Sequence, residues 1–384
     1  MHFGKRNLLA IVAAIITIGC VTVSAQTLTT LHSFNGGDGL SPEATLVQGS
    51  DGNFYGTTPL GGTQAKGTVF KIDAAGTLTT LHSFSGFPED GAAPVGGLVQ
   101  GSDGNFYGTT ASGGAFFQGT IFRMTSSGAI TVLHSFNSFF GEGAVPIAGL
   151  VQGSDGHFYG TTVLGGTHFQ GPIFKIDASG NFTTVHAFSG SPSEGANPVA
   201  SLMQGSDANF YGTTPSGGEH FQGTVFRITA AGDLTLLHSF SGYPAEGGVP
   251  FAALVQGIDG NFYGTTAVGG AHFKGTVFNI DAAGNVTTLH SFNGSPDEGA
   301  NPVAGLVQGS DGNFYGTTVL GGMHFRGTVF TIDATGSVTT LHSFSGSPDE
   351  GALPFAGLVE GSDGNFYGTT ALGGANGAGT VFSF

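Results

Sequence analysis

The chain has 384 residues, with 71 glycines, 35 phenylalanines, one cysteine and no tryptophan, and its formal net charge at pH 7 is −16. A chain this acidic repels phosphate backbones, so we do not expect nucleic acid as a partner. The glycines recur at fixed positions between apolar, β-branched and aromatic runs, which indicates many turns rather than a disordered tail.

The N-terminal segment has the features of a secretory signal. Two basic residues at 5–6 precede an apolar run at 8–18, which is too short for a stable membrane anchor. The sequence "VSA" at 23–25 places small residues at the positions that a signal peptidase reads. We therefore predict a signal peptide at 1–25 and a mature protein that begins at Gln26 and is secreted or periplasmic.

The single cysteine lies inside this predicted signal. Cys20 follows Gly19, so a lipoprotein anchored through Cys20 is an alternative, although Thr17 stands where such signals usually carry leucine. Without residues 1–25 the chain has no cysteine, which excludes disulfides and thiolate metal sites. It loses two of the nine basic residues and none of the 25 acidic ones, so its charge becomes −18. No later apolar run is long enough for a membrane helix.

An internal repeat fills the rest of the chain. The sequence "YGTT" recurs every 52 residues without spacers, beginning at Tyr55, Tyr107, Tyr159, Tyr211, Tyr263, Tyr315 and Tyr367. A repeat of this length is the size of a propeller blade.

Each repeat is predicted to form four short strands, which in the second unit cover 97–102, 105–110, 119–124 and 129–136. An Asp-Gly pair at 103–104 joins the first two strands and is a strong signal for a two-residue hairpin turn. Valine, isoleucine, threonine and aromatic residues dominate these runs, and no helical period appears.

The two ends of the chain hold complementary parts of one repeat. The last unit stops after its third strand at 379–384, whereas "TLTTLHSF" at 27–34 copies the fourth strand at 77–84. Pairing these ends closes a ring and removes an exposed sheet edge. We therefore predict an all-β, seven-bladed propeller over 26–384, with the last blade closed by the N-terminal strand. A linear solenoid, which needs polar capping units, is the alternative.

The consensus "AGLVQGSDGNFYGTT…GG…GTVF.IDA.G..TTLHSF" resembles the Gloeobacter/Verrucomicrobium-type (GloVer) tandem repeat of exported bacterial proteins, over the whole mature chain. Its strand pattern is also similar to that of NHL-repeat propellers, where a "DGN" turn joins the first two strands. Many GloVer proteins carry a C-terminal sorting domain, but this chain ends at Phe384. The resemblance therefore implies export, supplies no anchor and implies no activity.

The order of antiparallel strands sorts the loops onto two faces. The Asp-Gly turns and the "IDAAG" turns lie on one face, and turn chemistry explains their aspartates. The second-to-third loops and the inter-blade links lie on the opposite, long-loop face.

Every link carries an acidic residue before a glycine, and a proline follows four residues later. A ring of carboxylates would bind cations or sugar hydroxyls, whereas the alternative is that each carboxylate caps backbone N–H groups of its own loop. Recurrence in all units favours the capping role, and one carboxylate per loop falls short of the ligands that calcium needs. The seven residues are Asp38, Asp90, Glu142, Glu194, Glu246, Glu298 and Glu350.

The second-to-third loop varies from unit to unit. Units three to six carry His168-Phe169, His220-Phe221, His272-Phe273 and His324-Phe325, and the others carry Gln64-Ala65, Phe116-Phe117 and Asn376-Gly377. An exposed ring beside a carboxylate is a usual way to hold a sugar. We therefore predict ligand contacts from these His-Phe pairs together with Glu194, Glu246, Glu298 and Glu350. The alternative is that each phenylalanine only covers the rim of a neighbouring blade.

These histidines lie on different blades, which argues against a shared zinc site, and we expect no metal and no cofactor. A second histidine, in "LHSF", recurs in every unit and is interpreted as a packed, hydrogen-bonded residue between blades. At another recurrent position six units carry glutamine, from Gln48 to Gln308, and the seventh carries Glu360. We interpret this ring as a water-filled hydrogen-bond network along the central channel.

Three classes of function remain open. A multivalent binding module for glycans or another cell-surface ligand is favoured, because similar units give several similar weak sites that add by avidity. A structural or protein-interaction scaffold is second. A glycan lyase or hydrolase is third, since catalysis needs unlike groups converging on one point and this ring is nearly uniform. We expect a monomer.

Overall fold

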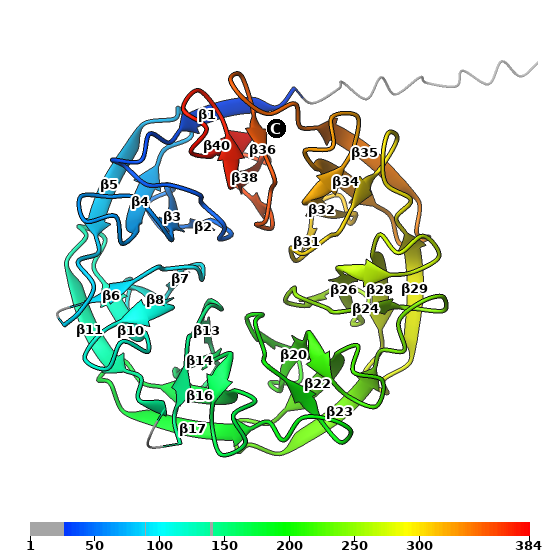
Figure 1. Cartoon of the computed structure of the whole chain (residues 1–384), viewed down its shortest axis with the longest axis horizontal. Helices are drawn as coiled ribbons and strands as arrows, with labels where there is room; N and C mark the ends of the chain where they lie inside the picture. The colour runs from blue at the N-terminus through cyan, green and yellow to red at the C-terminus, as the bar shows by residue number, and fades with distance from the viewer. Residues whose placement is uncertain (1–26, 89, 139–140) are drawn as a thin grey trace, which may run out of the picture.

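The computed structural model describes residues 27–88, 90–138 and 141–384, so the predicted signal peptide and Cys20 lie outside the described residues. Seven four-stranded antiparallel sheets stand as blades around a central channel (Figure 1). The prediction of an all-β, seven-bladed propeller is confirmed. No helix in the described ranges is long and apolar enough to span a membrane.

The strands of each blade are given from the channel outward. Blade 1 contains β2 (Val47–Gln48), β3 (Phe54–Thr58), β4 (Thr68–Ile72) and β5 (Leu78–Ser83). Blade 2 contains β7 (Val99–Gln100), β8 (Phe106–Thr110), β10 (Thr120–Met124) and β11 (Ile130–Ser135). Blade 3 contains β13 (Val151–Gln152), β14 (Phe158–Thr161), β16 (Pro172–Ile176) and β17 (Phe182–Ala187).

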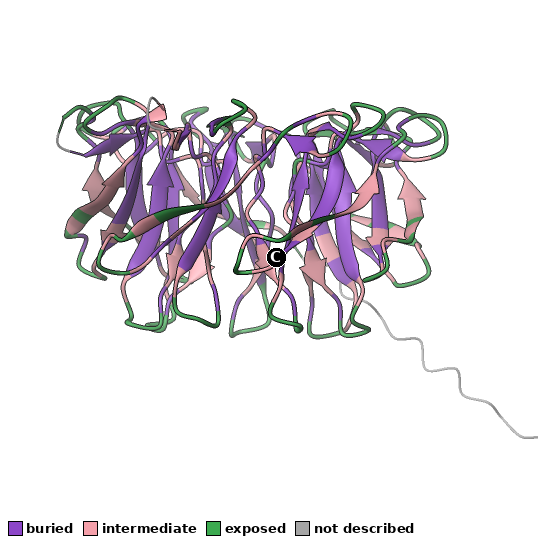
Figure 2. Ribbon diagram, turned by 90° about the horizontal axis from the view of Figure 1, so that it is seen from below, coloured by how far each residue is buried: buried purple, intermediate pink, exposed green. Residues whose placement is uncertain are grey.

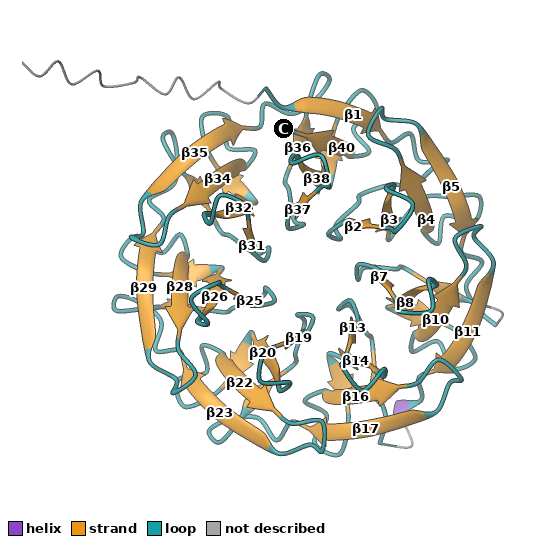
Figure 3. Cartoon of the chain, turned by 180° about the vertical axis from the view of Figure 1, so that it is seen from behind, coloured by secondary structure: helices purple, strands orange, loops and turns teal. Residues whose placement is uncertain are grey.

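The remaining blades follow the same order (Figure 3). Blade 4 contains β19 (Met203–Gln204), β20 (Phe210–Thr214), β22 (Thr224–Ile228) and β23 (Leu234–Ser239). Blade 5 contains β25 (Val255–Gln256), β26 (Phe262–Thr266), β28 (Thr276–Ile280) and β29 (Val286–Ser291). Blade 6 contains β31 (Val307–Gln308), β32 (Phe314–Thr318), β34 (Thr328–Ile332) and β35 (Val338–Ser343).

Blade 7 is built from both ends of the chain. It contains β37 (Val359–Glu360), β38 (Phe366–Thr370), β40 (Thr380–Ser383) and, as its outer strand, β1 (Thr29–Ser33). β1 runs antiparallel to β40, with Thr30 opposite Phe382 and His32 opposite Val381. The predicted closure by the N-terminal strand is therefore confirmed, and Figure 1 shows β1 along the outer edge of β40.

The two rims of the ring differ. Short hairpin turns form one rim, and the inter-blade links and second-to-third loops form the other, which we call the long-loop rim (Figure 2). On the long-loop rim a two-residue strand of each link pairs with a two-residue strand in the second-to-third loop of the blade that follows. These two-stranded sheets are too short to predict from sequence. In blade 1 a single bridge between Leu40 and Leu60 takes its place.

The paired segments are β6 (Gly91–Ala92) with β9 (Ser112–Gly113), β12 (Gly143–Ala144) with β15 (Leu164–Gly165), and β18 (Gly195–Ala196) with β21 (Ser216–Gly217). The others are β24 (Gly247–Gly248) with β27 (Val268–Gly269), β30 (Gly299–Ala300) with β33 (Leu320–Gly321), and β36 (Gly351–Ala352) with β39 (Leu372–Gly373).

The hydrophobic core is divided among the seven blade interfaces. At each interface the tyrosine of "YGTT" stacks on a phenylalanine of the next blade, with ring centroids 3.8–4.2 Å apart. A second aromatic pair meets edge to face at 5.1–5.4 Å, as Phe84 of blade 1 does with Phe122 of blade 2. The closing interface has both contacts, Tyr367 with Phe54 and Phe34 with Phe70.

Two rings of hydrogen bonds also cross every interface. A second-strand threonine donates to a main-chain carbonyl of the next blade at 2.8–3.3 Å, as Thr109 does to Ala148. On the short-turn rim the recurrent glutamine accepts the N–H of a residue in the preceding blade, as Gln100 does from Ser50. Glu360 does the same with Ser310. The predicted polar ring therefore includes direct hydrogen bonds between adjacent blades.

The constant spacing of the turn aspartate, the tyrosine and the following glycine within the repeat has a packing reason. The tyrosine hydroxyl donates to the turn aspartate at 2.7–2.9 Å in all seven blades, which fixes the hairpin turn to the core. The glycine that follows has no room for a side chain, because a Cβ at Gly108 would lie 2.7 Å from Cζ of Phe122. The structural role predicted for the turn aspartates is confirmed.

The first prediction concerns closure. Phe34 and Phe84 occupy equivalent, fully buried positions, one in the closing strand and one inside a continuous blade. If β1 is a full member of the ring, Phe34→Ala and Phe84→Ala should each cost about 3–5 kcal/mol, as buried aromatic truncations do. Chemical denaturation measures both. A Phe34→Ala variant as stable as the wild type would contradict the closure.

Removing residues 26–34 tests the same closure more severely. The partly buried Leu28 and Leu31 pack against the core with Phe34, and full burial of such a side chain contributes about 1.5–3 kcal/mol. We expect the shortened chain to unfold, or to associate through its opened edge. Light scattering and thermal melting distinguish these results from an unchanged monomer, which would exclude an essential role for β1.

The tyrosine–aspartate pairs predict a loss of stability at high pH. Burial and the hydrogen bond to the Asp51 carboxylate raise the pKa of Tyr55 to about 12. The same two causes raise the pKa of four other tyrosines to about 12, namely Tyr107, Tyr211, Tyr315 and Tyr367. Because the folded pKa is raised, the protonated tyrosine contributes its full stability below pH 10, the pKa of the unfolded chain. This contribution is lost as the pH rises through the folded pKa of about 12. The free energy of unfolding should therefore fall between these pH values. Tyr107→Phe should reduce that fall, and an equal slope for both proteins would contradict the assignment.

Candidate functional site

The long-loop rim presents a row of exposed phenylalanines on blades 2 to 6. The exposed fractions are 62% for Phe117, 72% for Phe169, 70% for Phe221, 58% for Phe273 and 66% for Phe325. These exposures argue against the interpretation that each ring only covers a neighbouring blade. The backbone of each loop turns back on itself, so that the N–H of Phe169 donates to the carbonyl of Gly166 at 3.3 Å.

This turn places each phenylalanine in the left-handed region of the backbone, with φ between 58° and 62°. Bulky residues pay about 1–2 kcal/mol for that conformation, and glycine does not. The equivalent positions of blades 1 and 7 are Ala65 (φ 53°) and Gly377 (φ 70°), so the turn forms without an aromatic ring. Neither burial nor backbone geometry explains the phenylalanines, which points to a role outside the fold.

Two further aromatic residues join this row, and the sequence reasoning missed them. Phe87 stacks on Phe117 with centroids 4.0 Å apart, and Tyr243 stacks on Phe273 at 3.6 Å. Both come from the inter-blade links and are half exposed. The sequence feature that could have identified them is the variable residue before the proline in the link. Phe87 and Tyr243 occupy this position, whereas three other links carry Ser191, Ser295 and Ser347 there.

Shallow grooves lie between blades beside these rings. One groove, of about 300 Å³, is lined by Phe169 and Leu164 of blade 3 and by Gln118 and Ser138 from the blade 2 side. A second, of about 290 Å³, is lined by Phe325 and Leu320 of blade 6. Its polar wall consists of Lys274, Asn293, Ser295 and Asn301. Each groove therefore combines an aromatic ring with hydrogen-bonding side chains of the preceding loop and link.

The histidines of the predicted pairs, His168, His220, His272 and His324, are exposed on the same loops. Nδ1 of His168 lies 3.1 Å from the hydroxyl of Thr167. His272 lies close enough to Glu298 to contribute to a lower pKa of that carboxyl group. The structure thus places the His-Phe pairs together at the solvent-facing edge of the long-loop rim.

The link carboxylates lie elsewhere and have partners already. In every blade the acidic residue pairs with Nε2 of the "LHSF" histidine, at 2.6–3.2 Å, for example Glu246 with His238. The same carboxylates accept backbone N–H groups of their own loops, as Glu194 does from Ser189 at 2.9 Å. Glu194, Glu246, Glu298 and Glu350 are half-buried in these pairs. Their geometry therefore favours the capping role over ligand contact. The hydrogen-bonded role of the "LHSF" histidine is confirmed for five units, whereas His290 and His342 lie at ion-pair distance from their glutamates without hydrogen-bond geometry.

Burial and hydrogen bonds act in opposite directions on these glutamates. Burial raises the pKa of Glu246, but the N–H of Ser241 and the imidazole of His238 outweigh it, and the net pKa is lowered. Glu194, Glu298 and Glu350 follow the same pattern. In residues 27–88, 90–138 and 141–384 no three histidine or acidic side chains gather in a way that could hold a metal ion.

A family model described as the Gloeobacter/Verrucomicrobia repeat matches residues 17–207 and 191–382. Among proteins with curated descriptions, none matches the chain. Among solved structures, a streptogramin B lyase has 14% identity and a TM-score of 0.59, with 93% of this chain and 96% of that chain covered. Virginiamycin B lyase from Staphylococcus aureus has 14% identity and a TM-score of 0.58, covering 93% and 97%.

The extracellular domain of a hybrid two-component system from B. thetaiotaomicron has 10% identity and a TM-score of 0.61. The match covers 92% of this chain and 39% of that one. At these identities the similarities show the propeller fold and nothing about activity.

The glutamate–histidine pairs predict acid sensitivity. A lowered pKa stabilises the fold above the unfolded value of 4.5, and this contribution is lost as the pH falls through the folded value. The melting temperature should therefore drop below about pH 4.5, and Glu246→Gln should lower it at neutral pH while reducing the drop. Glu219→Gln, at an exposed loop residue, is the control. Parallel pH profiles for wild type and Glu246→Gln would contradict the role of the pair.

Proposed function

The chain belongs to the Gloeobacter/Verrucomicrobia repeat family, and on that premise we propose that it is an exported binding module with several similar carbohydrate sites on its long-loop rim. The observation that carries this proposal is the row of phenylalanines held at positive φ with 58–72% of their surface exposed. Exposed rings at unfavourable backbone positions are retained on five successive blades, although the fold forms the same turn without them.

Carbohydrate suits the chemistry of the grooves. A sugar ring offers an apolar face that stacks on an aromatic side chain and hydroxyls that donate and accept hydrogen bonds. The groove beside Phe169 supplies the amide of Gln118 and the hydroxyl of Ser138, and the groove beside Phe325 supplies Lys274 and Asn293. These side chains replace the link glutamates as the proposed polar partners.

Repetition around the ring sets the expected mode of binding. One shallow groove with a single ring gives a weak site, but several grooves on one rigid ring engage a polymer together and add by avidity. The basic start, short apolar run and "VSA" of residues 1–25 support export to a compartment where surface polysaccharide is present.

A protein-interaction scaffold is the second candidate. The stacked pairs Phe87–Phe117 and Tyr243–Phe273 form exposed aromatic surface, which is also common at protein interfaces. In that case carbohydrate arrays would give no signal. Hydrolysis or elimination of a bound glycan would instead support an enzyme.

Substitution of the rim phenylalanines tests the proposal. Phe169→Gly, Phe221→Gly and Phe325→Gly remove the ring and place the residue that the left-handed position prefers, so stability should be unchanged or rise by about 1 kcal/mol. Binding to a carbohydrate array, and to isolated cell-wall polysaccharide, should fall stepwise as single, double and triple variants are compared.

The chain offers a matched control for these variants. Ala65→Gly makes the same backbone change on blade 1, where no ring is lost. It should leave binding unchanged. Rim variants that lose stability while keeping binding would show that the rings only pack the rim, and would overturn the proposed site.

A further inference from the structure

A pocket at the centre of the ring is a second, separate feature of the long-loop face. The residue after each link proline faces the mouth of the channel, and together the seven side chains enclose about 370 Å³. They are Glu43, Val95, Ile147, Val199, Phe251, Val303 and Phe355. Six of the seven are apolar, and all blades contribute one.

Glu43 breaks the symmetry of this ring. Its carboxylate is half-buried and accepts a hydrogen bond from the hydroxyl of Ser41 at 3.2 Å. No lysine, arginine or histidine is among the residues that line the pocket. Burial raises the pKa of Glu43, partly offset by the Ser41 hydroxyl. A carboxylate at this position has a desolvation cost, and no cationic side chain among the described lining residues offsets it.

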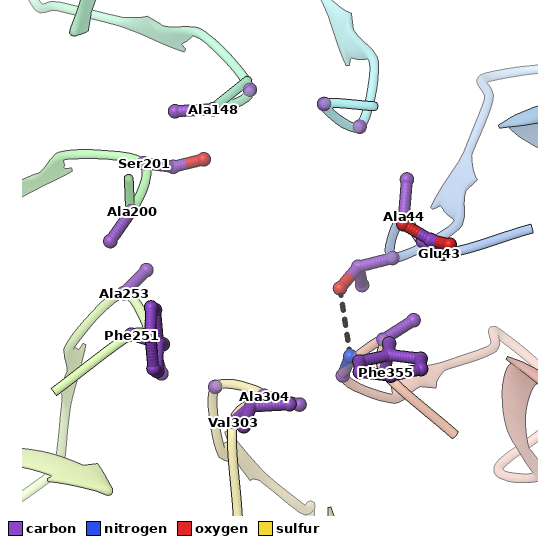
Figure 4. Close-up of a pocket in the computed structure, with 18 of the residues that line it drawn as sticks. Glu43, Ala44, Ala148, Ala200, Ser201, Phe251, Ala253, Val303, Ala304 and Phe355 are labelled. Atoms are coloured by element: carbon purple, nitrogen blue, oxygen red, sulfur yellow. Dashed lines mark hydrogen bonds between the residues drawn. The ribbon is translucent and has the colours of Figure 1, made fainter. Parts of the chain in front are cut away.

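Two aromatic rings share the pocket with this carboxylate. Figure 4 shows Glu43 and Phe355 beside each other on one side of the pocket, with Phe251 across from them. Phe251 and Phe355 keep 40% and 39% of their surface exposed, so their faces are accessible from the channel mouth. Three other blades form with valine at this position, namely Val95, Val199 and Val303, so the fold does not require an aromatic ring or a carboxylate there.

We propose that the channel mouth binds a small organic cation, an ammonium group on an apolar body, with Glu43 as its counter-ion. The ammonium group would interact with the carboxylate and with the faces of Phe251 and Phe355, which attract cations through their π electrons. The apolar body would contact the valines and Ile147. One carboxylate is too few for a bare calcium ion, and the charge of −16 disfavours anions.

Glu360 provides a control within the same channel. It is likewise the single carboxylate of its ring, but it lies on the short-turn rim and accepts hydrogen bonds from the N–H and the hydroxyl of Ser310. Glu360→Gln restores the residue of the other six blades and removes the same charge as Glu43→Gln. The two variants therefore separate a local contact from the overall field of an acidic protein.

The experiment uses benzyltrimethylammonium as the cationic probe, with benzyl alcohol and benzoate as neutral and anionic analogues. Calorimetry or ligand-observed NMR on the wild type should show binding of the cation in preference to both analogues. Glu43→Gln should weaken cation binding about tenfold, which corresponds to about 1.4 kcal/mol. Phe251→Val should weaken it as well, and Glu360→Gln should leave it unchanged.

Folding is controlled by Glu43→Val, which restores the apolar ring and should melt at or above the wild-type temperature without binding the cation. The rim variant Phe169→Gly should keep cation binding, so failure here is distinguishable from failure of the carbohydrate proposal. A wild-type protein that does not discriminate between benzyltrimethylammonium and benzyl alcohol would overturn the inference. So would equal weakening by Glu43→Gln and Glu360→Gln.

Discussion

The contact between adjacent blades is the interaction on which the rest of this structure depends. A single blade has short strands and an inner strand of two residues, too little to bury a core of its own. Each interface supplies a stacked Tyr–Phe pair, an edge-to-face Phe pair and hydrogen bonds across the gap. Because every blade packs against two neighbours, all blade faces are covered only when the last interface, between blades 7 and 1, also forms.

This requirement explains where the repeat is uniform and where it varies. The tyrosine and the first threonine of "YGTT" contact the next blade, and each unit carries them. Each unit also carries the aspartate, the glycine after the tyrosine and the second threonine, which fix the packing within their own blade. The tip of the second-to-third loop projects from the rim, and its phenylalanines remain mostly exposed. It therefore accepts alanine, phenylalanine or glycine at the same backbone angle, from Ala65 to Gly377. The exposed phenylalanines stand where the fold imposes no side chain.

The channel combines symmetry with single exceptions. Seven equivalent backbone positions bring seven side chains to one mouth, so one substitution changes the chemistry of the whole pocket. Glu43 places a carboxylate among apolar side chains, whereas Glu360 replaces a glutamine and keeps that residue's hydrogen bond to the preceding blade. Both are acidic exceptions in a repeated position, but their surroundings give them different consequences. Glu360 is integrated into an interface, whereas Glu43 has no basic partner among the residues that the structure describes.

The sequence by itself determined the strands of a blade and the number of blades, because the repeat period, the Asp-Gly turns and the strand composition can be read directly from the residues. It also determined the closure, because the segments 27–34 and 379–384 are complementary parts of one repeat that must pair to complete it. It also identified the phenylalanines as the variable feature. Only the tertiary structure decided that the glutamates are held by histidines eight residues earlier, that Phe87 lies on Phe117, and that Glu43 and Phe355 line one side of the same pocket. These juxtapositions depend on how links cross the rim and how blades converge on one axis, which no local pattern specifies.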